Sequence, residues 1–183
     1  MISEALQALY GGDREQAELL LGPDGELNVF DAAAFGRRER LAELLSEQPE
    51  LVNAFSSDGF TPLHLACFAG GAEAARLLVE RGADLEALSE ASFVKVRPLG
   101  TAAFARDREC AGVLLELGAD PNGRGEGGFT PLHTAAQNGD LDFVRLLLRH
   151  GADTTVVADD GRIPAALARD AGHEDVAELL AAR

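Results

Sequence analysis

A glycine-rich string is the first candidate for chemistry in this sequence. Residues 123–128 satisfy the pattern G-x-G-x-x-G. In dinucleotide-binding proteins this pattern follows a strand and opens a helix, so that free backbone N–H groups bind the pyrophosphate. Here the string follows a predicted helix that ends near Gly118, and it precedes Thr130 and Pro131 after a further turn. We therefore interpret it as a loop between helices and expect no cofactor.

Two side chains have a spacing that metal sites use. His64 and Cys67 lie three residues apart on one predicted helix, and such a pair can supply two ligands. The corresponding residues later in the chain are His133 and Ala136, so the second pair lacks a ligand. We expect no metal site, and we interpret Cys67 and Cys110 as residues that fill the core. Two cysteines also exclude a disulfide scaffold and are typical of a reducing compartment.

The sequence contains no pattern of residues that is typical of nucleophilic or acid–base catalysis. There is no G-x-S-x-G motif, and the serines fall in predicted loops or at a helix end. Acidic pairs at 159–160 and 174–175 stand in a loop and at a helix start, where carboxylates cap backbone amides. Catalytic carboxylates must instead converge in a cleft. We expect that the protein is not an enzyme.

Composition excludes further classes of function. The 183 residues include 31 Asp and Glu against 16 Lys and Arg, which gives a net charge of −15. That sign opposes binding to nucleic-acid phosphates. No apolar run is long enough to cross a membrane, and residues 1–16 do not resemble a signal peptide. We expect a cytoplasmic protein, and the 46% of apolar residues are enough for a core.

Internal repeats indicate the architecture. Residues 59–66, GFTPLHLA, return 69 positions later at 128–135 as GFTPLHTA. The tripeptide Gly-Ala-Asp at 82–84 returns at 118–120 and at 151–153, intervals of 36 and 33. These intervals divide the chain into a start, 1–23, and five units of one continuous domain: 24–56, 57–88, 89–125, 126–158 and 159–183.

Each unit has the residues of two short helices. In the second unit Thr61 can cap a helix that starts at Pro62, and Gly70 can end that helix in a left-handed conformation. A second amphipathic helix is predicted from about residue 72 to 81, and Gly82 follows it. One helix pair cannot bury its apolar face alone, so the units must stack.

The two T-P-L-H sequences, with Thr61 and His64 in one and Thr130 and His133 in the other, resemble the signature of the ankyrin repeat family. This resemblance implies an all-α solenoid of stacked antiparallel helix pairs with short β-turn loops. It also implies that both histidines are structural and bond to the threonine hydroxyl and to nearby backbone. In size the chain is similar to small stand-alone bacterial ankyrin proteins.

The same resemblance gives expectations for the parts that depart from the repeat. Residues 3–21 are expected to form a further, shortened helix pair that caps the stack. Because the third unit carries three extra residues, its loop, 88–95, is expected to be longer and less regular. Arg106 replaces the glycine between its helices, and we expect its inner helix to be less well fixed.

Phenylalanines supply the candidate binding surface. The chain has nine Phe, one Tyr and no Trp, and only Phe143 is expected on the core face of a second helix. Alignment of the units places Phe35, Phe68 and Phe104 beside the glycine between helices, a position that the resemblance implies is exposed on the concave side. Together with residues of the loop tips, this gives the candidate partner-binding residues Phe55, Phe60, Phe68, Phe93, Val96, Phe104, Arg124, Phe129, Gln137 and Asn138.

Exposed aromatic stripes are typical of surfaces that a partner covers. We therefore expect a monomeric module that binds a partner protein through its concave face and loop tips. An alternative for Phe68 and Phe104 is packing against a neighbouring loop. Two alternative functions also stay open: an acidic decoy or inhibitor of a basic nucleic-acid-binding protein, and self-association through the same stripe.

Overall fold

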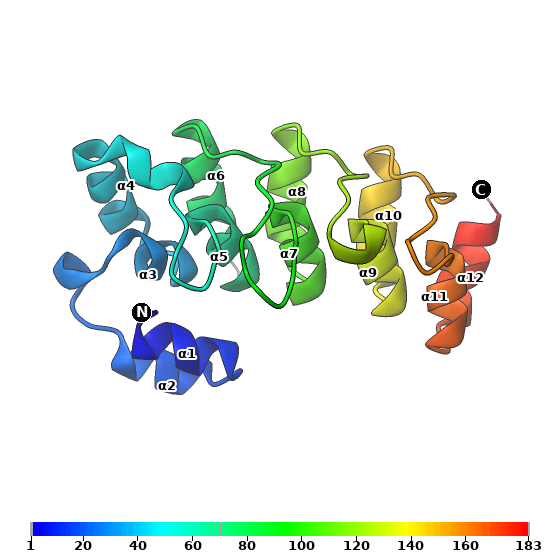
Figure 1. Ribbon diagram of the computed structural model, residues 1–183, viewed down its shortest axis with the longest axis horizontal. Coiled ribbons are helices and arrows are strands. Elements are labelled where there is room, and N and C mark those ends of the chain that lie inside the picture. Colours follow the sequence, from blue (N-terminus) through cyan, green and yellow to red (C-terminus); the bar gives the residue numbers. More distant parts are fainter. Residues whose placement is uncertain (1, 70, 183) are drawn as a thin grey trace.

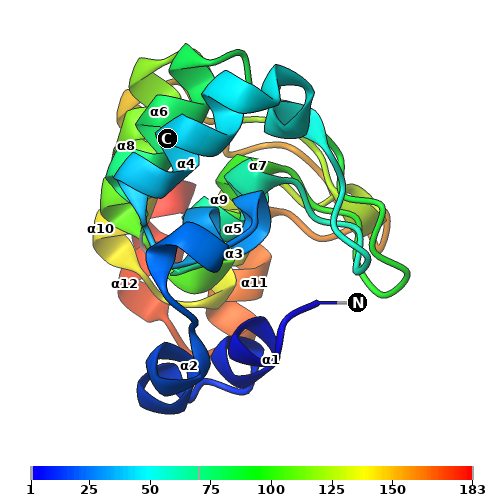
Figure 2. The same ribbon diagram turned by 90° about the vertical axis from the view of Figure 1, so that its left-hand side faces the viewer.

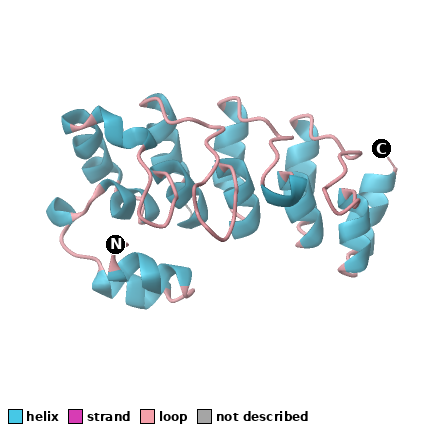
Figure 3. Ribbon diagram, viewed as in Figure 1, coloured by secondary structure: helices cyan, strands magenta, loops and turns pink. Residues whose placement is uncertain are grey.

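The computed structural model describes residues 2–69 and 71–182, which form a row of antiparallel helix pairs (Figure 1). Within those ranges every regular element is a helix (Figure 3), as predicted for an all-α solenoid. The α-helices are α1 (Glu4–Tyr10), α2 (Arg14–Leu20), α3 (Val29–Ala34), α4 (Arg38–Glu47), α5 (Pro62–Ala69), α6 (Ala72–Glu80), α7 (Pro98–Ala105), α8 (Arg108–Glu116), α9 (Pro131–Gln137), α10 (Leu141–Arg149), α11 (Pro164–Asp170) and α12 (Glu174–Ala181). Short 3-10 turns occur at Asp24–Glu26, Pro49–Asn53 and Glu126–Gly128.

The helices from α3 onward form two layers. The inner helices α3, α5, α7, α9 and α11 lie side by side, and each packs on the next. The outer helices α4, α6, α8, α10 and α12 cover one side of that layer, while the loops project from the other (Figure 2). Apolar side chains fill the space between the layers in one continuous core that runs from Leu27 to Leu180, with Phe143, Leu78 and Leu114 fully buried. No helix in the described ranges is both long and apolar enough to span a bilayer.

Local sequence explains the helix ends. Proline occupies the first position of α5, α7, α9 and α11, where its missing N–H is not needed. The carboxylates of Asp107 and Asp140 accept from the backbone of the third residue of α8 and of α10, at 2.9 and 3.0 Å. The helix predicted from 72 to 81 is α6, which begins where expected and ends one residue earlier. Gly70, the predicted end of α5, lies outside the described residues.

The inner helix of the third unit keeps its full length although the unit lacks the motif. Its inner helix α7 spans eight residues, the same number as α5. Arg106 follows α7 with a φ of 59°, and it has the only positive φ among the described residues that are not glycine. The corresponding residues after α3 and α9, Gly36 and Gly139, have φ of 63° and 67°. Arg106 therefore adopts a backbone conformation that costs an L-residue about 1 kcal/mol or more.

The predicted helix pair of residues 3–21 forms as α1 and α2, but it has a different orientation from the pairs of the repeats (Figure 1). In Figure 1, α1 and α2 lie below α3 and α5 and run across the direction of the other helices instead of continuing the row. Leu6 and Leu9 of α1 form a second apolar cluster with Phe35, Leu65 and other residues of the inner helices. Phe35, which the alignment placed on the exposed concave side, is thereby buried and keeps 4% of its surface exposed.

Candidate functional site

An apolar groove lies on the side of the inner helices from which the loops project. Its volume is about 570 Å³, within the usual range for a binding site. Its lining comes from the end of α1, from α5, α7 and the start of α9, and from the loops before those three helices. We call it the aromatic groove and define it by its large apolar side chains: Tyr10, Phe60, Phe68, Phe93, Val96, Phe104 and Phe129.

Tight loops place Phe60 and Phe129 at equivalent positions. The backbone N–H of Ser56 donates to the carbonyl of Phe60 at 2.9 Å, and the N–H of Gly125 donates to the carbonyl of Phe129 at 2.8 Å. Each loop thus folds back on itself immediately before the threonine that precedes an inner helix. The two phenylalanines consequently enter the groove from corresponding sites two repeats apart.

The loop of the third unit is longer, as its three extra residues predict. It closes between Ser89 and Val96, where the N–H of Ser89 donates to the carbonyl of Val96 at 2.9 Å. The buried Ser89 hydroxyl donates to the carbonyl of Val94 and accepts from the N–H of Val96, at 2.9 and 3.0 Å. These bonds hold a loop that presents Phe93 beside Phe60, with ring centroids 6.0 Å apart and an angle of 63° between the ring planes.

Backbone bonds also join each loop to the next. The N–H of Glu90 donates to the carbonyl of Gly59, and the N–H of Glu126 donates to the carbonyl of Lys95, at 2.7 and 2.6 Å. A third bond joins Asp159 N–H to the Gly127 carbonyl at 2.8 Å. The loops therefore form a connected wall, so the groove is held open before any partner arrives.

The motif histidines join each helix to the next loop. His64 Nδ1 lies 2.8 Å from Thr61 Oγ1, and its Nε2 lies 2.9 Å from the carbonyl of Val96. His133 repeats this arrangement with Thr130 and the carbonyl of Arg162, at 2.8 and 3.2 Å. Because a carbonyl only accepts, Nε2 carries the proton and Nδ1 accepts from the threonine. Burial lowers the pKa of His64 to about 4 and also lowers the pKa of His133, so both rings stay neutral at pH 7.

Tyr10 forms the end wall of the groove, and sequence reasoning missed it. Its hydroxyl donates to Asp58 Oδ2 at 2.7 Å, and its ring meets the Phe68 ring edge-on with centroids 5.4 Å apart. Burial and the Asp58 carboxylate raise the pKa of Tyr10, so it remains a donor. The only signal was a single tyrosine at the end of the first predicted helix, in a segment that the repeat pattern does not cover.

The groove residues differ in how much surface they leave open. Phe93 and Phe104 are 71% and 68% exposed. Phe60, Phe68 and Phe129 are half-buried, since Tyr10 covers part of Phe68 and the ring of His133 lies 5.2 Å from that of Phe129. The sequence left open whether Phe68 and Phe104 are exposed or packed against a loop. Phe104 is exposed. Phe68 is half-buried and so lies between these two alternatives.

Four of the predicted partner-binding residues do not line the groove. Phe55 lies outside the groove and is 40% exposed, and Gln137 is exposed at the end of α9. Asn138 donates to the carbonyl of Ala103 at 3.2 Å, and Arg124 donates to the carbonyl of Val157 at 3.1 Å and pairs with Asp159. Asn138 and Arg124 thus join neighbouring repeats.

The residues considered for cofactor or metal chemistry have other contacts. In the glycine-rich loop, a Cβ on Gly125 would lie 2.7 Å from the carbonyl of Lys95, so glycine there allows two loops to approach. Both ring nitrogens of His64 have partners within the fold, and Cys67 contacts Cys110 instead of a second histidine. The described residues contain no cluster of three or more His, Cys, Asp or Glu side chains suited to a metal ion.

Comparisons with known proteins agree with this architecture. The chain is 37% identical over 161 residues to cyclin-dependent kinase 4 inhibitor B of Mus musculus, covering 88% of the chain and 95% of that protein. It is 36% identical over 145 residues to protein phosphatase 1 regulatory subunit 27 of Mus musculus, covering 79% and 70%. It is 33% identical over 134 residues to ankyrin repeat and SAM domain-containing protein 6 of Rattus norvegicus, covering 73% of the chain but only 11% of that protein.

These relatives are mammalian, so they give no support to a bacterial type. A model of the family described as ankyrin repeats in three copies matches residues 4–125 and 99–183, nearly the whole chain. The sequence motifs, the stacked helix pairs and this match agree, and the chain belongs to the ankyrin repeat family, whose repeats are protein-interaction modules.

Proposed function

We propose that this chain is a non-catalytic module that binds a partner protein through its concave face and loop tips. The observation that carries the proposal is the aromatic groove, whose apolar side chains include Phe93 and Phe104 with most of their surface exposed. Aromatic side chains in a partly enclosed site are typical hot spots of binding, because covering them removes a large apolar area from water.

Preorganisation supports the same proposal. The loop wall is fixed by backbone bonds, and the two motif histidines tie it to α5 and α9. A surface that is already ordered loses little conformational entropy on association, so more of the contact energy appears as affinity. Charged residues at the rim would then select the partner.

The relatives suggest what kind of partner to test. By name, one is an inhibitor of a kinase and another is a regulatory subunit of a phosphatase. We propose by analogy that this chain regulates an enzyme by binding it, as a monomer in the cytoplasm, without bound metal, cofactor or nucleic acid. The division into residues 1–23 and five repeats within 24–183 belongs to the same proposal.

The test is affinity capture from a lysate of the native cells, with the retained proteins identified by mass spectrometry. The wild type is compared with the double variant Phe93→Ala, Phe104→Ala. Both side chains are largely exposed, so their removal should leave thermal stability unchanged. Because one hot-spot residue contributes about 2 kcal/mol or more, we expect the double variant to lose at least about thirtyfold in affinity.

Leu19→Ala is the matched control. Leu19 lies on α2 outside the groove and is 75% exposed, so the substitution removes a large exposed apolar side chain from another face. We expect this variant to capture the same protein as the wild type. If the groove variant captures that protein equally well, binding lies elsewhere and the proposal is wrong.

The negative net charge supports one alternative function. At −15 the protein could act as an acidic decoy or inhibitor of a basic nucleic-acid-binding protein. Association of that kind weakens steeply with salt, whereas burial of apolar surface does not. Affinity that falls sharply between low and physiological salt, yet survives Phe93→Ala and Phe104→Ala, would favour the decoy.

A further inference from the structure

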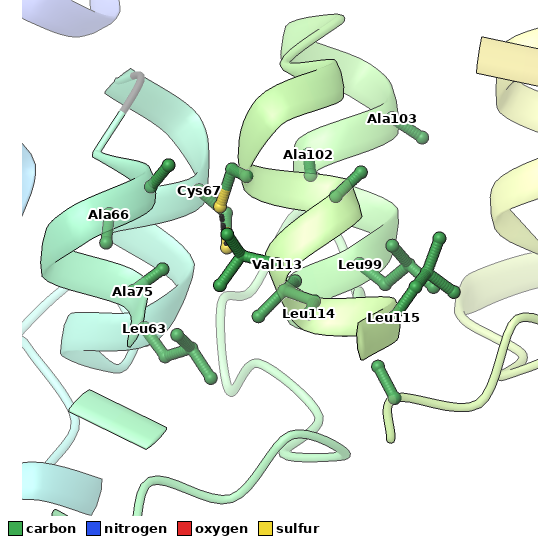
Figure 4. Close-up of a cluster of buried hydrophobic side chains, with 14 of the residues drawn as sticks. Leu63, Ala66, Cys67, Ala75, Leu99, Ala102, Ala103, Val113, Leu114 and Leu115 are labelled. Atoms are coloured by element: carbon green, nitrogen blue, oxygen red, sulfur yellow. Dashed lines mark hydrogen bonds between the residues drawn. The ribbon is translucent and has the colours of Figure 1, made fainter. Parts of the chain in front are cut away.

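The only two cysteines of the chain touch each other. Cys67 lies on α5 and Cys110 on α8, so they come from neighbouring repeats and are 43 residues apart in sequence. The Cys110 thiol donates to the Cys67 sulfur at an Sγ–Sγ distance of 3.0 Å, which Figure 4 shows as a dashed line in the apolar core. Both residues are fully buried.

Other repeats fill the two cysteine positions with other buried residues. The residue of the fourth repeat that corresponds to Cys67 is Ala136, and the residue of the second repeat that corresponds to Cys110 is Ala74; both alanines are buried. The fourth repeat carries the fully buried Phe143 at the position that corresponds to Cys110, so this core position accommodates side chains of different size. The two thiols nevertheless occupy non-equivalent positions, one on an inner and one on an outer helix, that meet across the boundary between repeats two and three.

We propose that Cys67 and Cys110 are a site of reversible covalent oxidation, at which an intramolecular disulfide joins α5 to α8. A disulfide bond is about 2.05 Å long. From 3.0 Å, the two sulfurs need to approach each other by roughly 1 Å.

The oxidant is a low-molecular-weight disulfide such as oxidised glutathione. One cysteine, as its thiolate, attacks a glutathione sulfur, the glutathione S–S bond breaks, and a glutathione thiolate leaves and takes up the proton. The second cysteine then attacks the protein sulfur of the mixed disulfide, and a second glutathione leaves. Two cysteine thiols are thus oxidised to one disulfide, and one oxidised glutathione is reduced to two glutathione molecules.

Burial controls how fast this happens. Burial, together with the contact to Cys110, raises the pKa of the Cys67 thiol, so little thiolate exists in the closed fold. An oxidant must also enter between repeats two and three, which requires local opening of the stack. We therefore expect slow oxidation of the folded protein and fast oxidation during refolding or in urea below the unfolding midpoint.

The disulfide should also change stability. It closes a loop of about 43 residues and removes conformational freedom from the unfolded chain. We expect the melting temperature of the oxidised protein to exceed that of the reduced protein by roughly 5 to 15 °C. This inference does not depend on the proposed function, because no partner enters its test.

The experiment refolds the full chain from urea in buffers of reduced and oxidised glutathione and measures the intact mass. We expect the loss of two hydrogen atoms, a monomer on a non-reducing gel, no thiol left for alkylation, and full reversal by a reductant. Cys67→Ala and Cys110→Ala are the matched variants, since Ala136 of the fourth repeat and Ala74 of the second repeat stand at the equivalent positions. Each should fold, take up one glutathione and show no loss of two hydrogens.

Two results would overturn the proposal. One is a refolded wild type that keeps both thiols free, or carries only glutathione adducts, at glutathione ratios that oxidise other protein dithiols. The other is a disulfide that forms only between chains and appears as a dimer on the non-reducing gel. Because the mass is read on the wild type, both results are decisive even if a single variant fails to fold.

Discussion

At the scale of single residues, the imidazole of His64 shows how the fold controls a titratable group. Its Nε2–H donates to the carbonyl of Val96, and its Nδ1 accepts from the hydroxyl and the backbone N–H of Thr61, so a proton on Nδ1 would end its role as an acceptor. The folded pKa is about 4, whereas the ring has a pKa near 6.5 in an unfolded chain. Unfolding is therefore linked to proton uptake.

The sign of the resulting pH dependence follows. Well above pH 6.5 the His64 ring is neutral in the folded and in the unfolded protein, and its full contribution to the free energy of unfolding is present. As the pH falls through 6.5 towards 4, the ring takes up a proton in the unfolded protein first, so this contribution is lost. Between pH 7.5 and 5 the loss from His64 is about 2 kcal/mol. The measurement is the free energy of unfolding in urea across this range for the wild type and for His64→Asn.

The variant should show a flatter pH dependence than the wild type. Burial raises the pKa of Asp31, which acts in the opposite direction, but that carboxyl is present in both proteins and cancels in the comparison. Parallel pH profiles of the two proteins would mean that His64 accepts a proton in the folded state.

Arg106 offers a second test at the residue scale. Its φ of 59° is one that glycine adopts freely and that an L-residue adopts at a cost. We expect Arg106→Gly to raise the free energy of unfolding by about 1 kcal/mol. Arg106→Ala keeps the Cβ atom, so it should leave the free energy of unfolding nearly unchanged. If both variants raise the free energy of unfolding equally, the gain comes from removal of the arginine side chain and not from the backbone conformation.

At the scale of elements, Gly59 tests whether the loops act as a connected wall. It has a φ of 88°, and a Cβ there would lie 2.2 Å from the backbone nitrogen of Ala91 in the next loop. Gly161 has almost the same φ, 87°, but a Cβ there would meet nothing within 4 Å. Alanine at either position costs about 1 to 2 kcal/mol from backbone strain.

Only Gly59→Ala must also push two loops apart. We expect it to lower the free energy of unfolding by about 1 to 3 kcal/mol more than Gly161→Ala does, as measured by urea denaturation. Amide exchange should also increase at Glu90, whose N–H bonds to the Gly59 carbonyl. Equal losses from the two variants would show that the contact between these loops contributes no stability.

Elements were predictable from sequence where their signals are local. Pro62 marks the start of a helix and Gly82 follows the end of the next, so the helix pairs of the repeats lie close to their expected bounds. The place of α1 was not predictable, because it depends on how Leu6 and Leu9 meet Phe35 and Leu65 across the inner helices. The packing of α1 on the inner helices therefore explains both why Tyr10 lines the groove and why Phe35 is buried.

At the scale of the whole molecule, the solenoid converts a repeated sequence into one continuous surface. Phe60, Phe93 and Phe129 come from three successive repeats, yet they line the same groove because inner helices and loops recur in register. The helix pair at the start of the chain adds Tyr10 at one end. The sequence identified most of these residues, but only the packing of the repeats shows which of them share a site.

The most direct test of the central claim is amide hydrogen exchange of the full chain, alone and bound to the protein that it captures. We predict slower exchange on binding in the loop 89–96 and in α7, which carry Phe93 and Phe104. The outer helices α6, α8 and α10 should exchange as before. Protection confined to those outer helices, with loop 89–96 and α7 unchanged, would contradict the account.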